Sequence, residues 1–176
     1  GNTVVDAVLE CIKIAEKKSN ILKKFILEDD QFILLTAHRP ATVDNKDNLK
    51  EVLKAVNILA ESHNKTVVFP AHPRTKKMME QFGVPINKKV KIIEPVGYLD
   101  MLTLQKKAFL IITDSGGIQE EGCILRKKVV VIRENTERPE AVEVGGCILA
   151  GNTDSEKIIE SANRLLEREE IGRAHV

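Results

Sequence analysis

The segment 113–121, Thr-Asp-Ser-Gly-Gly-Ile-Gln-Glu-Glu, carries the residue types in this sequence best suited to binding a charged ligand. It follows a run typical of a buried strand and leads into a pattern typical of a helix. Gly116 and Gly117 allow backbone N–H groups to approach a ligand closely, and the N-terminus of a helix attracts anions. The turn therefore predicts a phosphate site. The same residues also fit an ordinary helix cap by Ser115 with no ligand, and this alternative stays open here.

Glu121 lies about one and a half turns into the same expected helix, within reach of the same ligand. A carboxylate repels phosphate but accepts hydrogen bonds from neutral hydroxyl groups. Glu121 therefore predicts that the phosphate-bearing ligand also carries hydroxyls, as a ribose does.

Basic residues follow other apolar runs of the sequence. His38 and Arg39 come directly after residues 32–36, and Arg138 lies in a Glu-Arg-Pro segment after residues 129–132. Taken singly, a structural histidine, a solvated arginine and an ion-pair arginine explain them. If these three residues lie at one edge of a sheet beside the Ser-Gly-Gly turn, together they indicate a binding site for a phosphorylated nucleotide. The residues alone predict such a ligand but no reaction.

The elements that must position these residues alternate along the chain. The sequence contains short, continuous apolar runs rich in β-branched residues. Such runs are typical of strands buried on both faces, as in a parallel sheet. The expected strands are 32–36, 66–69, 90–93, 109–113, 129–132 and, more weakly, 147–149. The expected helices are 4–18, 45–62, 73–82, 98–107, 116–125 and 154–169, the last capped by Thr153 or Asp154. This order predicts an α/β domain, a Rossmann-like doubly wound parallel sheet, in which ligands bind beyond the carboxyl ends of the strands.

The composition excludes several classes of function. The 176 residues carry a net charge of +1, which argues against nucleic acid or an anionic membrane as a charge-driven partner. Aromatic residues make up 3% of the chain, too few for a base-stacking surface. No apolar run approaches the ~20 residues of a membrane span, and no cysteine or histidine spacing indicates a metal. Three scattered cysteines predict reduced thiols in a cytoplasmic protein.

The chain resembles the non-hydrolysing UDP-N-acetylglucosamine 2-epimerases over most of its length, and specifically their C-terminal domain. The opening Gly-Asn-Thr-Val-Val-Asp-Ala resembles the start of that domain, and Thr36-Ala37-His38-Arg39 resembles the family's T-x-H-R block. Segments 113–121 and 136–141, the latter Thr-Glu-Arg-Pro-Glu-Ala, resemble its two most specific signatures and stand at the family's separation. The family's Asn-Pro-Tyr-Gly-Asp-Gly-like segment near the C-terminus has no counterpart here.

The resemblance implies an isomerase with two Rossmann-like domains in a GT-B-type fold, of which residues 1–176 would be the second. Such an enzyme interconverts UDP-N-acetylglucosamine and UDP-N-acetylmannosamine without a cofactor or metal, by elimination and re-addition of UDP. The proton-transfer carboxylates belong to the first domain, so the present chain alone is expected to bind UDP but not to epimerise. The resemblance further implies a cytoplasmic homodimer that acts in polysaccharide biosynthesis.

The resemblance also assigns roles to single residues. Ser115, Gly116 and Gly117 would bind the diphosphate, and Glu121 would accept from the ribose hydroxyls. His38 would contact the substrate near the scissile bond and support the departure of UDP. Three further positions belong to the expected site. They are Arg138 beside the nucleotide sugar, and Val96 and Met101 framing the uracil. His72 resembles a family position linked to a second, activating UDP-sugar site.

Two other functions fit the same residues. One is the donor-binding domain of a GT-B glycosyltransferase, which would use the same helix N-terminus and a similar ribose carboxylate. The other is a non-catalytic nucleotide-sugar-binding module. Exchange of the sugar C2 hydrogen with deuterated water distinguishes an epimerase from both.

Overall fold

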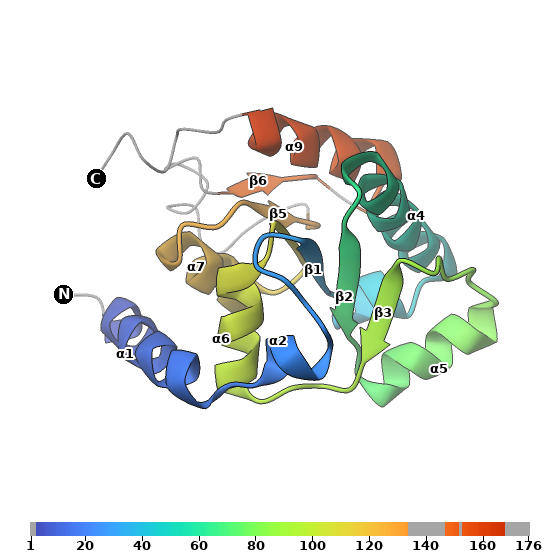
Figure 1. Cartoon of the computed structure of the whole chain (residues 1–176). Helices are drawn as coiled ribbons and strands as arrows, with labels where there is room; N and C mark the ends of the chain where they lie inside the picture. The colour runs from blue at the N-terminus through green and yellow to red at the C-terminus, as the bar shows by residue number, and fades with distance from the viewer. Residues whose placement is uncertain (1–2, 134–146, 152, 168–176) are drawn as a thin grey trace.

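The computed structural model describes residues 3–133, 147–151 and 153–167. These residues form a six-stranded parallel sheet covered by helices on both faces (Figure 1). The sheet order is β3-β2-β1-β4-β5-β6. The strands are β1 (Phe32–Thr36), β2 (Thr66–Pro70), β3 (Val90–Ile93), β4 (Leu110–Thr113), β5 (Val129–Val131) and β6 (Cys147–Leu149). The predicted fold class, a Rossmann-like doubly wound parallel sheet, is confirmed.

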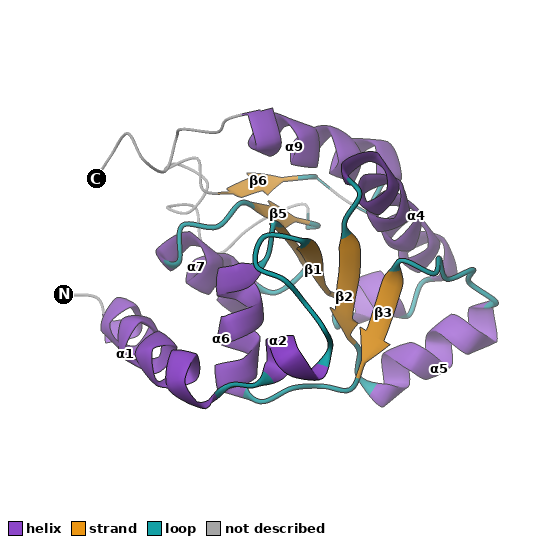
Figure 2. Cartoon of the chain, viewed as in Figure 1, coloured by secondary structure: helices purple, strands orange, loops and turns teal. Residues whose placement is uncertain are grey.

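The helices divide between the two faces of the sheet, as Figure 2 shows. One face carries α4 (Lys46–His63), α5 (Pro73–Phe82) and α9 (Ser155–Glu167), and the other carries α2 (Ile21–Lys24), α6 (Tyr98–Lys107) and α7 (Gly116–Ile124). Helix α1 (Thr3–Lys18) packs outside α6 and α7, and α3 (Pro40–Val43) precedes α4. None of the helices in the described ranges has the length and apolar character needed to cross a bilayer.

The side chains of β1 show why the strand sequences are apolar at every position. Ile33 and Leu35 belong to the core under α4, whereas Phe32 and Leu34 belong to the core under α6. All four are essentially inaccessible to solvent. Successive residues of a strand point to opposite faces, so a sheet covered on both sides needs apolar residues at every position.

The predicted elements agree with the structure to within a few residues at their ends. Asn45 caps α4, because its side chain accepts from the backbone N–H of Asn48 at 3.1 Å. The side chain of Asp154 accepts from the N–H of Glu156 at 2.9 Å and thereby caps α9. The short helices α2 and α3 were not predicted, because four residues are too few to show helical periodicity.

Gly122 lets α7 pack closely on β4 and β5. A β-carbon at this position would lie 2.7 Å from Cγ2 of Val129 and 3.5 Å from Cδ1 of Ile111, both fully buried. We expect Gly122→Ala to lower the free energy of unfolding by about 1–3 kcal/mol, despite the better helix propensity of alanine. Thermal melts followed by circular dichroism measure this loss, which corresponds to about 2–4 °C in Tm per kcal/mol.

Gly97 is the matched control for that substitution. A β-carbon at Gly97 would meet no other atom within 4 Å, and its backbone φ is −69°. Gly97→Ala makes no clash, so it should cost only the weaker N-cap preference of alanine over glycine, about 0.5 kcal/mol. Equal losses in the two variants would contradict the packing role of Gly122.

Candidate functional site

The carboxyl ends of β1 and β4 lie side by side in the middle of the sheet. Thr36 and Thr113 are register partners, and their hydroxyl oxygens are 2.6 Å apart. The chain leaves β1 for β2 on one side and β4 for β5 on the other, so the strand order reverses between them. In open α/β sheets such a switch point is where ligands bind. The loops that carry the predicted His38 and Ser115 both start here.

Asp114 joins these two loops. Its Oδ2 accepts from the backbone N–H of His38 at 3.0 Å and of Arg39 at 2.9 Å, while Nδ1 of His38 lies 3.1 Å from Oδ1. The Asp114 side chain is fully buried, whereas the His38 side chain is 61% exposed. The imidazole is therefore anchored on one side and open on the other. Arg39, expected beside His38 at this edge of the sheet, donates from Nε to the carbonyl of Asp114 at 2.8 Å.

The Ser-Gly-Gly turn opens α7 as predicted. Oγ of Ser115 accepts from the N–H of Ile118 at 3.3 Å, so the serine caps the helix. The N–H of Ser115 donates to Oγ1 of Thr113 at 2.9 Å. Gly116 and Gly117 occupy the first two helical positions, whose N–H groups have no intrahelical acceptor. These two donors, with the partial positive charge of the helix N-terminus, are suited to bind an anion.

The two glycines are not required by the fold. Neither has a positive φ. A β-carbon on Gly116 would lie 3.8 Å from Nη1 of Arg133, and a β-carbon on Gly117 would lie 3.7 Å from Oγ of Ser115. Both distances are ordinary van der Waals contacts. Side chains would therefore fit the protein at both positions. What glycine adds here is access, because it leaves the backbone N–H groups open to close approach.

Glu121 faces α6. Nε2 of Gln105 donates to Oε2 of Glu121 at 2.7 Å, and the Tyr98 hydroxyl donates to the same carboxylate. Burial raises the pKa of Glu121 above the ordinary 4.5, and the two hydrogen bonds only partly oppose that rise. Gln105 is completely buried, and its Oε1 has no hydrogen-bond partner in the described ranges. The carboxylate is thus held against α6 by Gln105 and Tyr98, which sequence reasoning did not foresee.

Three other predicted residues follow the carboxyl ends of β2 and β3. Val96 and Met101 are partly buried and pack against the core under α6. His72 is exposed after β2, and its Nδ1 accepts from the N–H of Arg74 at 3.2 Å, which makes it the cap of α5. Arg138 lies outside the described residues, as does the rest of segment 136–141.

Arg133 is a residue that sequence reasoning did not single out. It follows β5, and its Nη1 is buried without a hydrogen-bond partner in the described part of the chain. This atom lies beside the start of α7, 3.8 Å from where a β-carbon of Gly116 would be. A buried donor without an acceptor is costly unless a ligand satisfies it. The available signal was a cation two residues past a buried strand.

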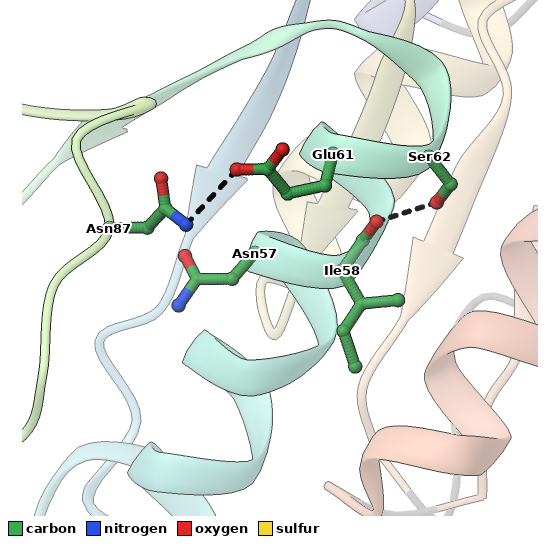
Figure 3. Close-up of a pocket in the computed structure, with 5 residues that line it drawn as sticks. All are labelled: Asn57, Ile58, Glu61, Ser62 and Asn87. Atoms are coloured by element: carbon green, nitrogen blue, oxygen red, sulfur yellow. Dashed lines mark hydrogen bonds between the residues drawn. The ribbon is translucent and has the colours of Figure 1, made fainter.

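A hollow of about 540 Å³ lies elsewhere on the surface (Figure 3). It is lined by Asn57, Ile58, Glu61 and Ser62 of α4 and by Asn87 of the facing loop, whose Nδ2 donates to Glu61 at 3.3 Å. These residues come from the last turns of α4 and the segment before β3, so the hollow lies toward the amino ends of the strands. It is therefore separate from the site at the carboxyl ends. Among the described residues, no group of three His, Cys, Asp or Glu side chains is placed to hold a metal.

The sequence is similar to known proteins over almost its full length. The family model for UDP-N-acetylglucosamine 2-epimerase matches residues 1–175. The UDP-N-acetylglucosamine 2-epimerase of Methanocaldococcus jannaschii is 48% identical over 174 residues, which cover 96% of this chain and 47% of that protein. The protein of the same name from Escherichia coli K12 is 37% identical over 188 residues, which cover 99% of this chain and 49% of the relative.

Solved structures agree with these matches. The M. jannaschii UDP-GlcNAc 2-epimerase in complex with UDP-GlcNAc and UDP matches with a TM-score of 0.85 at 47% identity, over 96% of this chain and 47% of that one. The E. coli ADP-heptose LPS heptosyltransferase II matches with a TM-score of 0.61 at 17% identity, over 88% of this chain and 52% of its own, which shows a shared fold alone. The chain spans about half the length of the curated relatives it matches. Because the family model covers nearly every residue, this chain belongs to the UDP-N-acetylglucosamine 2-epimerase family.

Proposed function

We propose that residues 1–176 form the C-terminal, UDP-binding domain of a two-domain, GT-B-type UDP-N-acetylglucosamine 2-epimerase. The enzyme would interconvert UDP-N-acetylglucosamine and UDP-N-acetylmannosamine by elimination and re-addition of UDP. The observation that carries the proposal is the open helix N-terminus of α7 at the switch point, which lies beside the unpartnered Nη1 of Arg133. The half-length match to relatives supports a second domain that would supply the proton-transfer carboxylates.

The geometry supports roles for the residues at the carboxyl ends of β1 and β4 and in α7. The diphosphate would sit on the N–H groups of Gly116 and Gly117, with Ser115 holding the turn. Glu121 would accept from the ribose hydroxyls, and His38 would contact the substrate near the scissile bond. The remaining assignments rest on the family resemblance. They are Val96 and Met101 framing the uracil, Arg138 lining the nucleotide-sugar site, and His72 at a second UDP-sugar site.

Isothermal titration calorimetry of this chain with UDP tests the site. Saturable binding to the wild type supports the proposal, and its absence at millimolar UDP would refute the site assignment. The reaction is tested on the full-length protein, with UDP-N-acetylglucosamine as substrate in deuterated water. Formation of UDP-N-acetylmannosamine with deuterium at C2 identifies an epimerase. The glycosyltransferase alternative is not favoured, because the heptosyltransferase shares the fold at only 17% identity.

Three further expectations concern the full-length protein. The full protein would be a homodimer that acts in the cytoplasm in polysaccharide biosynthesis, as the family resemblance implies. The three cysteines form no disulfide with one another in this structure. Light scattering of the full-length protein measures the number of subunits, and a monomer at micromolar concentration would contradict the dimer.

Arg133 offers a test of the diphosphate position. Arg133→Met keeps most of the side-chain length but removes the buried charge, so we expect UDP affinity to fall by about 10- to 100-fold, the usual worth of a charge-assisted hydrogen bond. The fold should be unaffected, because Nη1 has no partner in the described residues to lose. Calorimetry with UDP and a thermal melt measure the two effects. Arg164→Met, an exposed arginine of α9, is the control with the same change in charge, and equal affinity losses in both variants would contradict the contact.

A further inference from the structure

Asp114 is a buried carboxylate surrounded by hydrogen-bond donors. Oδ2 accepts from the backbone N–H groups of His38 and Arg39, at 3.0 and 2.9 Å. Oδ1 lies 3.1 Å from Nδ1 of His38 and 3.2 Å from its backbone nitrogen. A buried carboxylate must be paired to be tolerated. The backbone N–H groups of His38 and Arg39 are therefore the donors that make the burial of Asp114 possible, and the His38 imidazole lies against the same carboxylate.

This contact dictates where the proton of His38 resides. A carboxylate can only accept hydrogen bonds, so the ring nitrogen that faces it must carry hydrogen. A neutral imidazole has one N–H, and the carboxylate oxygen 3.1 Å away favours the form with that N–H at Nδ1. The lone pair then lies at Nε2, on the outer side of a ring that is 61% exposed. A further proton can be added only at Nε2, and it turns that atom from an acceptor into a donor.

Further hydrogen bonds hold Asp114 between β1 and β4. The N–H of Asp114 donates to the carbonyl of Thr36 at 3.3 Å, and the carbonyl of Asp114 accepts from Nε of Arg39 at 2.8 Å. The hydroxyls of Thr36 and Thr113 bridge the two strands directly beneath. The carboxylate is thus held by both β1 and β4. If the imidazole turned away, the buried Oδ1 would keep the backbone N–H of His38 but lose its contact with the ring.

We infer that Asp114 is the positioning residue of His38, which fixes the neutral imidazole in its Nδ1–H form and offers Nε2 to the ligand. The inference deepens the proposed function and rests on it for the identity of that ligand. A protonated Nε2 donates to a phosphate oxygen of UDP, while Asp114 on the far side balances the charge of the ring. Relays of this kind fix the tautomer of a working histidine in other enzymes, and disturbing the carboxylate there changes the tautomer without moving the chain.

Nitrogen-15 NMR of the histidine rings tests the inference in this chain. At a pH where the ring is neutral, we expect the His38 signals to report hydrogen on Nδ1, and His38→Gln assigns those signals by removing them. In Asp114→Asn the amide oxygen can still accept from the two backbone N–H groups. The amide nitrogen then faces Nδ1 as a donor, so the neutral ring is expected to change to the Nε2–H form.

Asp100→Asn is the matched control, because it removes one carboxylate that accepts from Ser19 at 2.6 Å, away from His38. It should leave the His38 tautomer as in the wild type. An Nε2–H form in the wild type overturns the inference, and so does an unchanged tautomer in a folded Asp114→Asn variant. Addition of UDP should shift the Nε2 signal more than the Nδ1 signal, and the opposite order overturns the role of Nε2. The tautomer measurement needs no ligand. A failure of UDP binding would therefore refute the proposed function but not the positioning of His38 by Asp114.

Discussion

Ser115→Trp is expected to abolish UDP binding while the domain stays folded. The indole would stand at the entrance to α7, where the N–H groups of Gly116 and Gly117 are to meet the diphosphate. Filling that space removes the anion position as a whole rather than a single hydrogen bond. We therefore expect affinity to fall by more than about 100-fold, which corresponds to about 2.8 kcal/mol. Isothermal titration calorimetry with UDP measures the loss, and circular dichroism confirms the fold.

Ser115→Ala separates the steric effect from the capping effect. Both substitutions remove the hydrogen bond from the Ile118 N–H to the serine oxygen, and the loss of such a cap costs about 1 kcal/mol of stability. Alanine, however, leaves the space above the two glycines open. The alanine variant should lose a similar amount of stability and still bind UDP within a few-fold of the wild type. Full affinity in the tryptophan variant would show that the diphosphate does not bind at this turn.

Glu121→Gln is expected to weaken UDP binding and to preserve or raise thermal stability. The carboxylate is half-buried, and burial raises its pKa, so the folded state bears a cost for keeping it charged. A glutamine can still accept from Nε2 of Gln105, the contact that Glu121 makes at 2.7 Å. It accepts less strongly from two ribose hydroxyls, so we expect affinity to fall by roughly 10- to 100-fold. Calorimetry measures the loss of UDP affinity, and thermal melts measure the preserved or raised stability. The control variant is Glu160→Gln, at an exposed position of α9.

The raised pKa of Glu121 also predicts two dependences on pH. A carboxyl group whose pKa is higher in the folded state adds stability at low pH, and this contribution is lost as pH rises through the folded pKa. The Tm of Glu121→Gln should therefore equal that of the wild type below about pH 4.5, the ordinary glutamic acid value, and exceed it near neutrality.

Binding should follow the opposite course. UDP affinity of the wild type should begin to fall on acidification while the pH is still above 4.5, because protonation removes an acceptor from the ribose site. Subtracting the profile of Glu121→Gln cancels the titration of UDP itself. If UDP affinity depended on pH in the same way in the two proteins, the proposed contact between Glu121 and the ligand would be wrong.

The polar residues of the site were harder to predict than the strands. Ser115 and the two glycines were recognised because a turn between a strand and a helix is encoded within a few consecutive residues. Asp114 was part of the same segment, yet no role followed for it from the sequence. Its partners lie 75 and 76 positions earlier in the chain. Gln105 and Arg133 were missed for the same reason, because each is defined by what it contacts across the fold.

The capping alternative for Ser115 shows a different limit. The sequence left open whether this serine caps a helix or contacts a ligand, and the structure shows that its side chain does cap the helix. The two functions are not exclusive, because capping occupies the N–H of Ile118 and leaves those of Gly116 and Gly117. His72, likewise singled out for a ligand role, has its Nδ1 engaged in a cap.

The amino-acid sequence alone determined the parallel α/β class, the succession of strands and helices, and the glycine turn at the start of α7. These depend on local periodicity and on short-range backbone preferences, which consecutive residues encode. Only the tertiary structure decided that β1 and β4 are neighbours, that Asp114 holds His38, and that Glu121 turns toward α6. Those relations depend on the order of strands in the sheet and on burial, which set the partner, charge and pKa of a side chain through residues far away in the chain.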